Sequence, residues 1–370
     1  MKKALLISCF NWYKTRLEPI REILLEKGYE VTILIADFDH FNKAPIRNKY
    51  PECVYITVPR YKKNLSIRRV YSHLFFGREV NKYLEKEQPD LVYCQVPPNN
   101  VAKYCTRYKK QKPETKLILD IIDLWPESIP QRSVLCKVAL GVISPIWKKW
   151  RKDCIETADH IFTECDFYRE KLRLPPEKSS TLYLFKEQTE EEQRLVQKII
   201  NEKKDDGIVR FAYLGSMNHI IDIEGIVVVI KKFIEDGYEC QLHAIGDGEN
   251  RKEFEKVVID TGCITYFYGS VHDEMKKIQI LAPCDYALNM MKSTSEVGLT
   301  TKSIDYLSYG LPLINNIKGD TWGLVDDKGC GVNVQNLDEL QKSFDHTKIM
   351  KVYLDKFVKK TFIASAYDRL

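Results

Sequence analysis

Short apolar runs rich in β-branched residues recur along this chain, and each is followed by a stretch with helical periodicity. Residues 4–9 and 31–35 form the first two runs, and the amphipathic stretch between them ends at Gly28, a common helix terminator. A continuously apolar strand has no side suited to water, so it must be covered on both faces. The alternation therefore predicts an α/β fold with a parallel, doubly wound sheet.

The alternation runs along the whole chain with one interruption. In the first half, strands are expected at residues 91–95 and 116–122, with a basic helix at 66–87. The pattern breaks at Pro175-Pro176 and in the charged stretch 186–206. Further strands, separated by helices, are expected at residues 209–214, 240–245, 265–268, 286–290 and 312–315.

A chain of 370 residues is suited to two domains, because single cores rarely grow much beyond 250–300 residues. We expect an N-terminal Rossmann-like domain over residues 1–180 and a charged connector over residues 181–206. A second Rossmann-like domain should occupy residues 207–345. The remaining segment, 346–370, is expected to be helical and to return towards the first domain.

Cysteine usage and hydropathy point to a cytoplasmic protein. The eleven cysteines are scattered, with no C-x-x-C pair and no histidine at metal-ligand spacing, so neither disulfides nor a zinc site is indicated. The first residues resemble a signal peptide, but the apolar run ends at Asn11 and no cleavage site follows, so a β-strand is expected. The chain contains no run of 18 apolar residues, so we expect no membrane span.

The two halves differ in charge. Lys and Arg outnumber Asp and Glu by 33 to 22 over residues 1–180, whereas the corresponding counts are 24 and 30 over residues 181–370. A basic first half indicates an anionic partner, such as a lipid headgroup or a phosphate-bearing acceptor, with simple solubility as the alternative. Two stretches, 60–82 and 133–152, interleave aromatic and basic residues. They could bind the inner face of a plasma membrane peripherally. The alternative is that Trp147 and Trp150 pack against the sheet.

Glycine turns follow three successive strands expected in the second half, at Gly215, at Gly246 with Gly248, and at Gly269. Glycine allows the backbone to approach a ligand closely, and the amides that open the following helix can bind phosphate. Turns between strands and helices also use glycine for purely structural reasons. Three such turns in order nevertheless favour a ligand site at this edge of the sheet.

The segment 295–312 is the strongest candidate for a nucleotide site. It contains Glu296, followed by a glycine and an expected helix on which Lys302 and Asp305 share one face. A helix N-terminus beside a lysine suits a diphosphate, and a carboxylate one turn along can accept hydrogen bonds from ribose hydroxyls. The alternative is an ordinary capped helix stabilised by an ion pair between Lys302 and Asp305.

The order GS, IGDG, YGSV, CDYALNM and KSIDYLSYGLPLI resembles the C-terminal domain of retaining GT-B glycosyltransferases, glycosyltransferase family 4. Within that family the chain looks most like bacterial capsule and surface-polysaccharide glycosyltransferases. The likeness covers nearly all of residues 207–335 and, more loosely, IIDLWPES at residues 121–128. It implies two Rossmann-like domains facing a central cleft, with the donor on the second domain and the acceptor on the first.

The resemblance implies transfer of a sugar from a UDP- or GDP-linked donor to a saccharide or lipid-linked saccharide. No D-x-D dyad is positioned to ligate a metal, so a metal-independent reaction is expected, with no cofactor and no nucleic-acid partner. Asp305 matches the second acidic residue of the family's E-x7-E element, which contacts ribose, whereas the first falls on Val297, one position after Glu296. Lys302 would neutralise the donor diphosphate. The full set of expected donor-binding residues is Gly215, Ser216, His219, Gly246, Asp247, Gly248, Val271, Glu296, Gly298, Thr300, Thr301, Lys302 and Asp305.

The first half supplies the candidates for acceptor chemistry. Asp123 and Glu127, in the segment that matches the family's D-x-W-P-E pattern, are candidates for acceptor contact or general-base catalysis, with capping of the turn before Pro126 as the alternative. Candidate acceptor-binding residues after the first strand are Asn11, Tyr13 and Arg16. Two other functions remain open: a sugar-nucleotide 2-epimerase on the same scaffold, and a non-catalytic partner of an active transferase.

Overall fold

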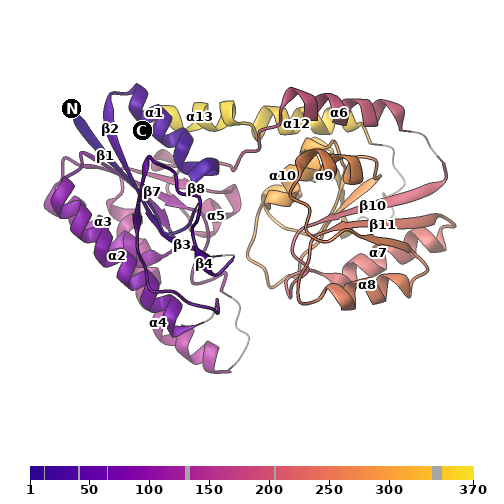
Figure 1. The fold of residues 1–370 in the computed structure, drawn as a ribbon, viewed down its shortest axis with the longest axis horizontal. Coiled ribbons are helices and arrows are strands. Elements are labelled where there is room, and N and C mark those ends of the chain that lie inside the picture. The colour runs from indigo at the N-terminus through magenta and orange to yellow at the C-terminus, as the bar shows by residue number, and fades with distance from the viewer. Residues whose placement is uncertain (12, 41, 65, 130–133, 204–205, 336–343) are drawn as a thin grey trace. The chain divides into compact units, whose positions relative to one another are not determined.

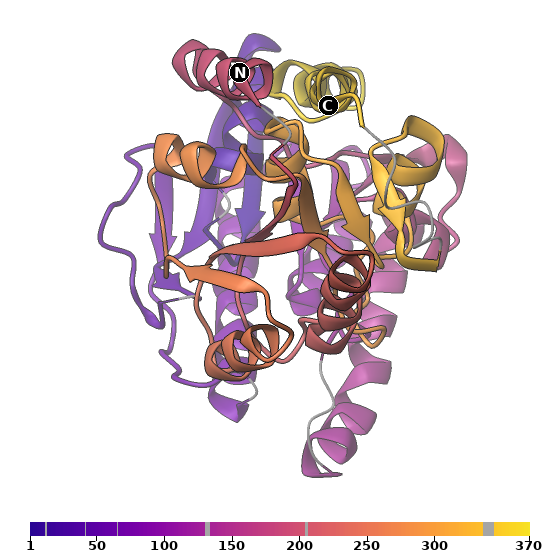
Figure 2. The ribbon, with the colours of Figure 1, turned by 90° about the vertical axis from the view of Figure 1, so that its right-hand side faces the viewer.

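The computed structural model describes the chain except for residues 12, 41, 65, 130–133, 204–205 and 336–343, and for residues 13, 14, 134–137 and 139 it describes the backbone only. It divides into two compact units, Met1–Leu184 with Lys360–Leu370 (unit 1) and Phe185–Lys359 (unit 2). Each unit is an α/β domain built around its own sheet (Figures 1 and 2).

Unit 1 contains a parallel seven-stranded sheet in the order β5-β2-β1-β6-β7-β8-β9. Its strands are β1 (Lys2–Ser8), β2 (Tyr29–Ala36), β5 (Cys53–Ile56), β6 (Leu91–Val96), β7 (Lys116–Ile121), β8 (His160–Thr163) and β9 (Ser179–Thr181). A separate antiparallel pair consists of β3 (Phe38–Asp39) and β4 (Ala44–Pro45). The helices are the π-helix η1 (Tyr13–Leu17), α1 (Glu18–Glu26), α2 (Ile67–Glu87), α3 (Asn99–Gln111), α4 (Val134–Thr157), α5 (Asp166–Lys171), the short 3-10 helix η2 (Pro176–Lys178) and α13 (Lys359–Tyr367).

The helices of unit 1 cover both faces of its sheet, as the buried strands require. Every residue of β6 is buried, so this central strand has no face exposed to water. On one face α3 packs between α2 and α4, while α1 and α13 lie on the other (Figure 1). Among the helices described, none is both long enough and apolar enough to cross a membrane.

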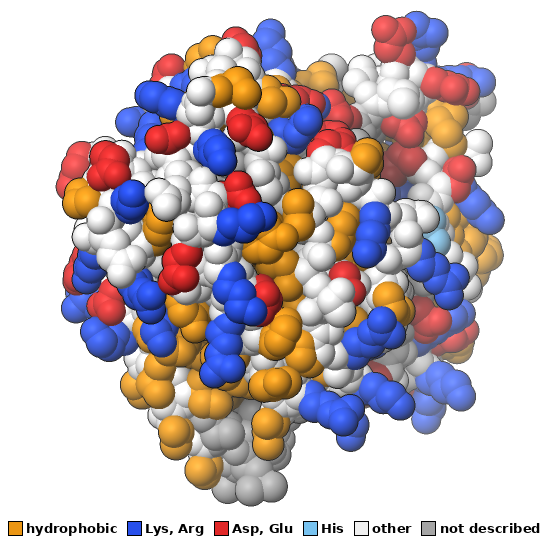
Figure 3. Space-filling model, turned by 60° about the vertical axis from the view of Figure 1, so that its left-hand side comes forward, with side chains coloured by type: hydrophobic (Ala, Val, Ile, Leu, Met, Phe, Trp, Pro, Cys, Tyr) orange, Lys and Arg blue, Asp and Glu red, His pale blue; other side chains and the backbone are white. Residues whose placement is uncertain are grey.

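Helix α4 carries an apolar stripe that its own unit does not cover. Val138, Val142 and Ile146 are spaced four residues apart and are 63%, 68% and 47% exposed. Residues at this spacing lie on one side of a helix. Lys149 and Lys152 continue the helix and are also exposed. Figure 3 shows hydrophobic side chains gathered towards the lower end of the view, with Lys and Arg side chains beside them.

Unit 2 contains a parallel six-stranded sheet in the order β12-β11-β10-β13-β14-β15. Its strands are β10 (Ile208–Leu214), β11 (Glu239–Ile245), β12 (Ile264–Phe267), β13 (Tyr286–Asn289), β14 (Leu313–Asn315) and β15 (Gly331–Asn333). Its helices are α6 (Glu190–Glu202), α7 (Ile223–Glu235), α8 (Arg251–Ile259), α9 (Glu274–Leu281), α10 (Thr301–Ser308), α11 (Asp320–Lys328) and α12 (His346–Lys356). The charged stretch expected as a connector thus forms α6, which packs against α9 within this unit.

Both sheets have the strand order of dinucleotide-binding Rossmann domains. Counted along the chain, the six strands of unit 2 lie in the order 3-2-1-4-5-6, and unit 1 has the same order with β9 added at its edge. The prediction of two doubly wound parallel sheets is confirmed. In such sheets the strand order reverses at a switch point, where ligands bind at the carboxyl ends. These points lie between β1 and β6 in unit 1 and between β10 and β13 in unit 2.

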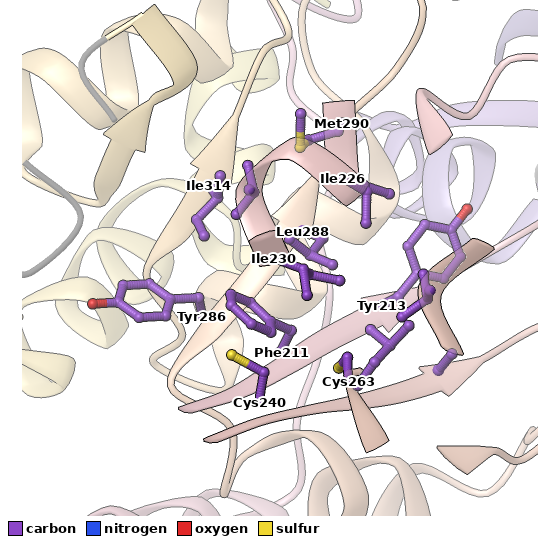
Figure 4. Packing of buried hydrophobic residues seen from close by; sticks show 14 of the residues in the cluster. Phe211, Tyr213, Ile226, Ile230, Cys240, Cys263, Tyr286, Leu288, Met290 and Ile314 are labelled. Carbon is purple, nitrogen blue, oxygen red and sulfur yellow. The ribbon is translucent and has the colours of Figure 1, made fainter. Parts of the chain in front are cut away.

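The core of unit 2 is built around aromatic rings from strands and helices on one side of the sheet (Figure 4). Phe211 of β10 has its ring centroid 6.2 Å from that of Tyr286 on β13 and 5.3 Å from that of Phe233 on α7. All three side chains are at most 9% exposed. This packing fixes β10 and β13, the two strands that flank the switch point.

A ladder of buried asparagines joins the carboxyl ends of three strands in unit 2. Asn289, Asn315 and Asn333 occupy the same row of β13, β14 and β15. The amide of Asn289 donates to Asn315 over 2.8 Å, and that of Asn315 donates to Asn333 over 2.7 Å. Asn289 Oδ1 in turn accepts from the hydroxyls of Thr300 and Ser303 at the start of α10. The ladder therefore anchors α10 to the sheet.

Substitution of Asn315 by Ala should destabilise the protein by about 3 kcal/mol, since each buried polar group that loses its partner costs about 1–3 kcal/mol. The amide of Asn289 and the carbonyl oxygen of Asn333 would both lose a partner. Urea unfolding of Asn315→Ala and of the exposed control Asn201→Ala would measure the difference. Equal free energies of unfolding for the two variants would show that the ladder contributes no stability.

Candidate functional site

The three glycine turns of unit 2 lie side by side at the carboxyl ends of β10, β11 and β12. Gly215 N donates to Ile245 O over 2.9 Å, and Gly246 N donates to Gly269 O over 2.8 Å. All three glycines have positive φ. Backbone amides and carbonyls of the three loops are thus held in one row at the edge of the sheet.

The close packing of these loops accounts for two of the glycines. A Cβ on Gly246 would lie 1.9 Å from Gly215 O, and one on Gly248 would lie 2.4 Å from Met217 O. Either contact is far too short for a side chain. Asp247 accepts a backbone hydrogen bond from Met217 N over 2.9 Å, while its own carboxylate is largely exposed. Gly246 and Gly248 are therefore required to bring the loops together, and Asp247 presents a carboxylate beside them.

Helix α10 begins at the switch point of unit 2. Its N-cap is Thr300, whose hydroxyl accepts from Ser303 N over 3.2 Å. The buried Gly298 precedes it and accepts two hydrogen bonds from Thr321. Tyr306, one turn into the helix, is fully buried and its hydroxyl accepts from Leu214 N over 2.6 Å. This contact ties α10 directly to the end of β10.

Lys302 lies beside the first glycine turn. Its Cδ is 3.9 Å from the position of a Cβ on Gly215, and its Nζ is 5.2 Å from the centroid of the Tyr213 ring. Among the described residues it forms no ion pair, so the alternative of an ion pair between Lys302 and Asp305 does not hold. Burial lowers the pKa of Lys302 to about 8. The amine is thus a partly desolvated cation without a counter-charge.

Asp305 faces a different set of groups. Its Oδ1 accepts from Lys186 Nζ over 2.6 Å, and the same amine donates to Glu274 Oε1 over 2.5 Å and to the Tyr309 hydroxyl over 3.1 Å. Burial alone would raise the pKa of Glu274, but the Lys186 ammonium holds it at about 2. Asp305 Oδ2 accepts no hydrogen bond from the described residues. One oxygen of this carboxylate is thus occupied and the other is open to a ligand.

The other expected donor-binding residues lie around this edge. His219 is half-exposed, with Nδ1 3.5 Å from Glu249 Oε1. Thr301 is exposed at the first position of α10, whereas Glu296 and Val271 are partly buried in the preceding loops. The carbonyl of Ser216 accepts from the hydroxyl of Tyr213 over 3.0 Å, which orients the first glycine turn.

In unit 1, two carboxyl groups follow neighbouring strands. Asp123 comes after β7 and Glu164 after β8, and burial raises the pKa of both. The pKa of Glu164 reaches about 8, with the charge of Arg16 opposing the shift and that of Asp123 adding to it. Asp123 Oδ1 accepts from the Ser128 hydroxyl over 2.6 Å. Glu164 can therefore hold and release a proton near neutral pH. This residue was not among the candidates predicted from the sequence.

Glu127 forms ion pairs within unit 1. Arg151 donates to both of its oxygens, over 2.6 and 3.0 Å, and Lys148 lies 3.6 Å away. Burial opposes the shift, but Arg151 lowers the pKa of Glu127. A carboxylate held in this way is a poor proton acceptor, so we assign Glu127 a structural role.

The aromatic residues of this region also pack within unit 1. Trp147 is 8% exposed and stacks on Trp125, with ring centroids 5.9 Å apart, so the packing alternative holds for it.

Arg16 is buried in unit 1 and unavailable to an acceptor. It is 1% exposed and donates from Nε and Nη2 to both oxygens of Asp120, over 2.8 and 2.5 Å, and from Nη1 to Leu182 O. Arg16 follows an apolar strand, as a ligand-binding residue would, but its long charged side chain forms an ion pair inside the unit with Asp120. Asn11 is exposed. The side chain of Tyr13 lies outside the described part of the chain.

Comparison with known proteins supports the architecture. No protein-family model matches the chain, and no curated protein matches it in sequence. Among solved structures, the lipopolysaccharide outer core galactosyltransferase WaaB in its apo form is 16% identical with a TM-score of 0.63, and the match covers 100% of both chains. HepE from Anabaena, solved with UDP and glucose, is 12% identical with a TM-score of 0.59, again over 100% of both chains.

A putative UDP-N-acetylglucosamine 2-epimerase from Listeria monocytogenes is 10% identical with a TM-score of 0.53, over 99% of this chain and 94% of that one. These proteins share a fold with two parallel-sheet domains. The chain therefore has the fold of GT-B glycosyltransferases, a fold that the epimerase shares.

Proposed function

We propose that this protein is a glycosyltransferase that uses a nucleoside-diphosphate sugar, linked to UDP or GDP, as its donor. The observation that carries the proposal is Lys302, a partly buried cation without a counter-charge beside Gly215 at the switch point of unit 2. A desolvated cation is costly unless an anion joins it. A nucleotide diphosphate at this point would supply that anion and would also meet the amides that open α10.

The ribose and the diphosphate of the donor each have a suitable group in unit 2. The glycine turn at 215 has no side chain to keep the nucleotide from its backbone, and a Cβ there would meet only Lys302 Cδ, at 3.9 Å. Asp305 Oδ2 is suited to accept from ribose hydroxyls, while Lys186 on Oδ1 orients the carboxylate. Lys302 would neutralise the diphosphate as it leaves, which is the electrostatic contribution that a reaction without a metal ion requires.

For the reaction, we propose that the bond between the sugar's anomeric carbon and the diphosphate breaks as the acceptor oxygen bonds to that carbon. Net retention of configuration is part of the proposal and follows the family resemblance. Asp123 is the candidate to accept the proton of the acceptor hydroxyl, and the raised pKa of Glu164 suits it to share that proton. The acceptor would be a saccharide or lipid-linked saccharide of surface-polysaccharide synthesis.

The epimerase neighbour makes epimerisation a second candidate function. The two activities differ in their need for an acceptor, because an epimerase converts the donor sugar alone. Incubation of UDP- and GDP-sugars with and without saccharide acceptors, followed by product analysis, separates them. A new sugar nucleotide formed without acceptor would support the epimerase, and turnover of no donor would support a non-catalytic partner.

Variants of Lys302 and Asp305 test the donor site. Lys302→Met should weaken UDP binding about 10- to 100-fold but uridine binding little, because hydrogen bonds to charged groups are worth about 1.5–3 kcal/mol. Asp305→Ala should weaken both ligands, since both contain the ribose. Calorimetric titration would measure these affinities, with the exposed pair Lys252→Met and Asp260→Ala as controls. Equal losses of UDP and uridine in Lys302→Met would remove this lysine from the diphosphate.

The affinity for UDP should also depend on pH through Lys302. The pKa of this amine in the free protein is lowered to about 8, so it is charged below that pH and neutral above it. Because UDP is already fully ionised above pH 7, its affinity should fall as the pH rises from 7 to 9, with the decline centred near 8. Lys302→Met should abolish the decline and Lys302→Arg should shift it above pH 9. A wild-type affinity that is constant over this range would contradict the assignment.

We further propose peripheral contact of unit 1 with an anionic membrane surface on the cytoplasmic side. The exposed apolar stripe of Val138, Val142 and Ile146 supports it, together with the neighbouring Lys149 and Lys152. Apolar side chains flanked by lysines are suited to the boundary between headgroups and acyl chains. Each basic residue near an anionic leaflet adds about 1 kcal/mol.

Val142→Asp should reduce binding to phosphatidylglycerol-containing vesicles, because it places a negative charge in the apolar stripe. A matched control is Val228→Asp, which introduces the same change at an exposed valine of α7 in unit 2. Cosedimentation with vesicles would report at least a several-fold loss for Val142→Asp alone. The membrane proposal fails if both variants sediment like the unmodified protein.

A further inference from the structure

A buried arginine in unit 1 is surrounded by rings. Arg69, in the first turn of α2, is 9% exposed, and its guanidinium carbon lies 4.4 Å from the centroid of the Trp125 ring and 5.9 Å from that of Tyr61. Three more rings complete what we term the Arg69 cluster, which consists of Phe10, His40, Tyr61, Arg69, His73 and Trp125. Cation–π contact offsets part of the cost of burying this charge, but it provides no negative charge.

Arg69 has no carboxylate partner among the described residues. Of its five N–H donors, Nη1 donates to Asn64 O over 3.0 Å, while Nε has no hydrogen-bond partner. The neighbouring carboxylates form hydrogen bonds with other residues: Asp39 accepts from the backbone and side chain of Asn42, and Asp123 accepts from Ser128. Burying a guanidinium without a counter-charge is energetically unfavourable, so its presence here indicates an anionic ligand.

Other basic groups converge on the same place. His73 is 3% exposed, and neither of its ring nitrogens has a hydrogen-bond partner among the described residues. Its ring centroid is 5.9 Å from that of Phe10 and 5.5 Å from that of Trp125. His40 Nδ1 lies 2.7 Å from the Tyr61 hydroxyl, and the Nζ of the nearby Lys43 is 5.6 Å from the centre of the Tyr61 ring. Burial, with the charge of Arg69, lowers the pKa of both histidines, so in the empty protein they are neutral.

The cluster lies where a doubly wound sheet binds ligands. Phe10 follows β1, one of the two strands at the switch point of unit 1, and Trp125 follows β7. Phe10 and His40 are only partly buried, so they form the solvent-exposed edge of the cluster. The aromatic rings around the charge would exclude water from a bound anion and so strengthen its attraction to Arg69.

We propose that the Arg69 cluster binds a phosphoryl group of the acceptor. A phosphoryl group carries up to two negative charges and three terminal oxygens, enough to receive Arg69 Nε, His73 and Lys43 together. A carboxylate has a single charge and would satisfy fewer of these donors. The inference rests on the proposed function, because it identifies the acceptor as a phosphate- or diphosphate-bearing saccharide, whether carried on a lipid or free in solution.

Calorimetric titration with inorganic pyrophosphate and with geranyl diphosphate, in the presence of saturating UDP to fill unit 2, tests the site. Arg69→Gln should weaken both probes at least 10-fold. The matched control is Arg68→Gln, which removes the same charge from the exposed neighbouring residue and should bind both like the unmodified protein. Tighter binding of geranyl diphosphate than of pyrophosphate would identify a lipid-linked source, and equal binding a soluble one.

The proposal is overturned if pyrophosphate does not bind, or if Arg69→Gln and Arg68→Gln bind it equally. Where Arg69→Gln fails to fold, His73→Phe keeps a ring in the core and should still weaken both probes. Thermal stabilisation by UDP, measured separately, monitors the donor site in every variant. If UDP does not stabilise the unmodified protein but pyrophosphate still binds in an Arg69-dependent way, the donor proposal is refuted and the phosphoryl-site proposal is not.

Discussion

The hydrogen bonds among Asn289, Asn315 and Asn333 are the constraint on which the geometry of the carboxyl edge of unit 2 depends. A parallel sheet leaves its carboxyl ends as loops, and loops alone do not hold a helix at a fixed height above the strands. The ladder does so, because Asn289 also accepts from the hydroxyls of Thr300 and Ser303. These contacts fix the N-terminus of α10, and with it the positions of the residues one turn along. Buried amides satisfied in this way specify one arrangement, since any shift would leave them unpaired.

Much of this fold could be predicted from the sequence, because apolar periodicity is a local property that survives into the structure. The two doubly wound parallel sheets follow from continuous apolar runs separated by helices, whereas the order of their strands comes from the structure. The three glycine turns were also predictable, and the contact of Gly246 with Gly215 O gives the physical reason for one of them. The asparagine ladder was not predicted, although each asparagine ends an apolar strand. Its recognition requires the register between strands, which the sequence does not specify.

The contacts that the sequence could not predict are those whose partners lie far along the chain. The alternative of an ion pair between Asp305 and Lys302, three residues earlier, does not hold, because Asp305 pairs with Lys186, 119 residues away. Arg16 follows a strand, as a ligand-binding residue would, yet Asp120 draws it into the core from 104 positions away. Local spacing gives the face of a helix on which a residue lies. Which distant charge meets that face depends on tertiary packing.

Lys302 and Arg69, the cations on which the two proposed sites rest, differ from a structural ion pair. The Arg16–Asp120 pair is buried and fully hydrogen-bonded, so it requires nothing further. Lys302 and Arg69 are also desolvated, but neither has a carboxylate partner among the described residues, and each lies at the carboxyl edge of a sheet of the same strand order. Stability alone would favour an apolar side chain at both positions. The presence of these two cations is best explained if each binds an anion from solution. A buried cation without a carboxylate partner is therefore the most informative feature of both units.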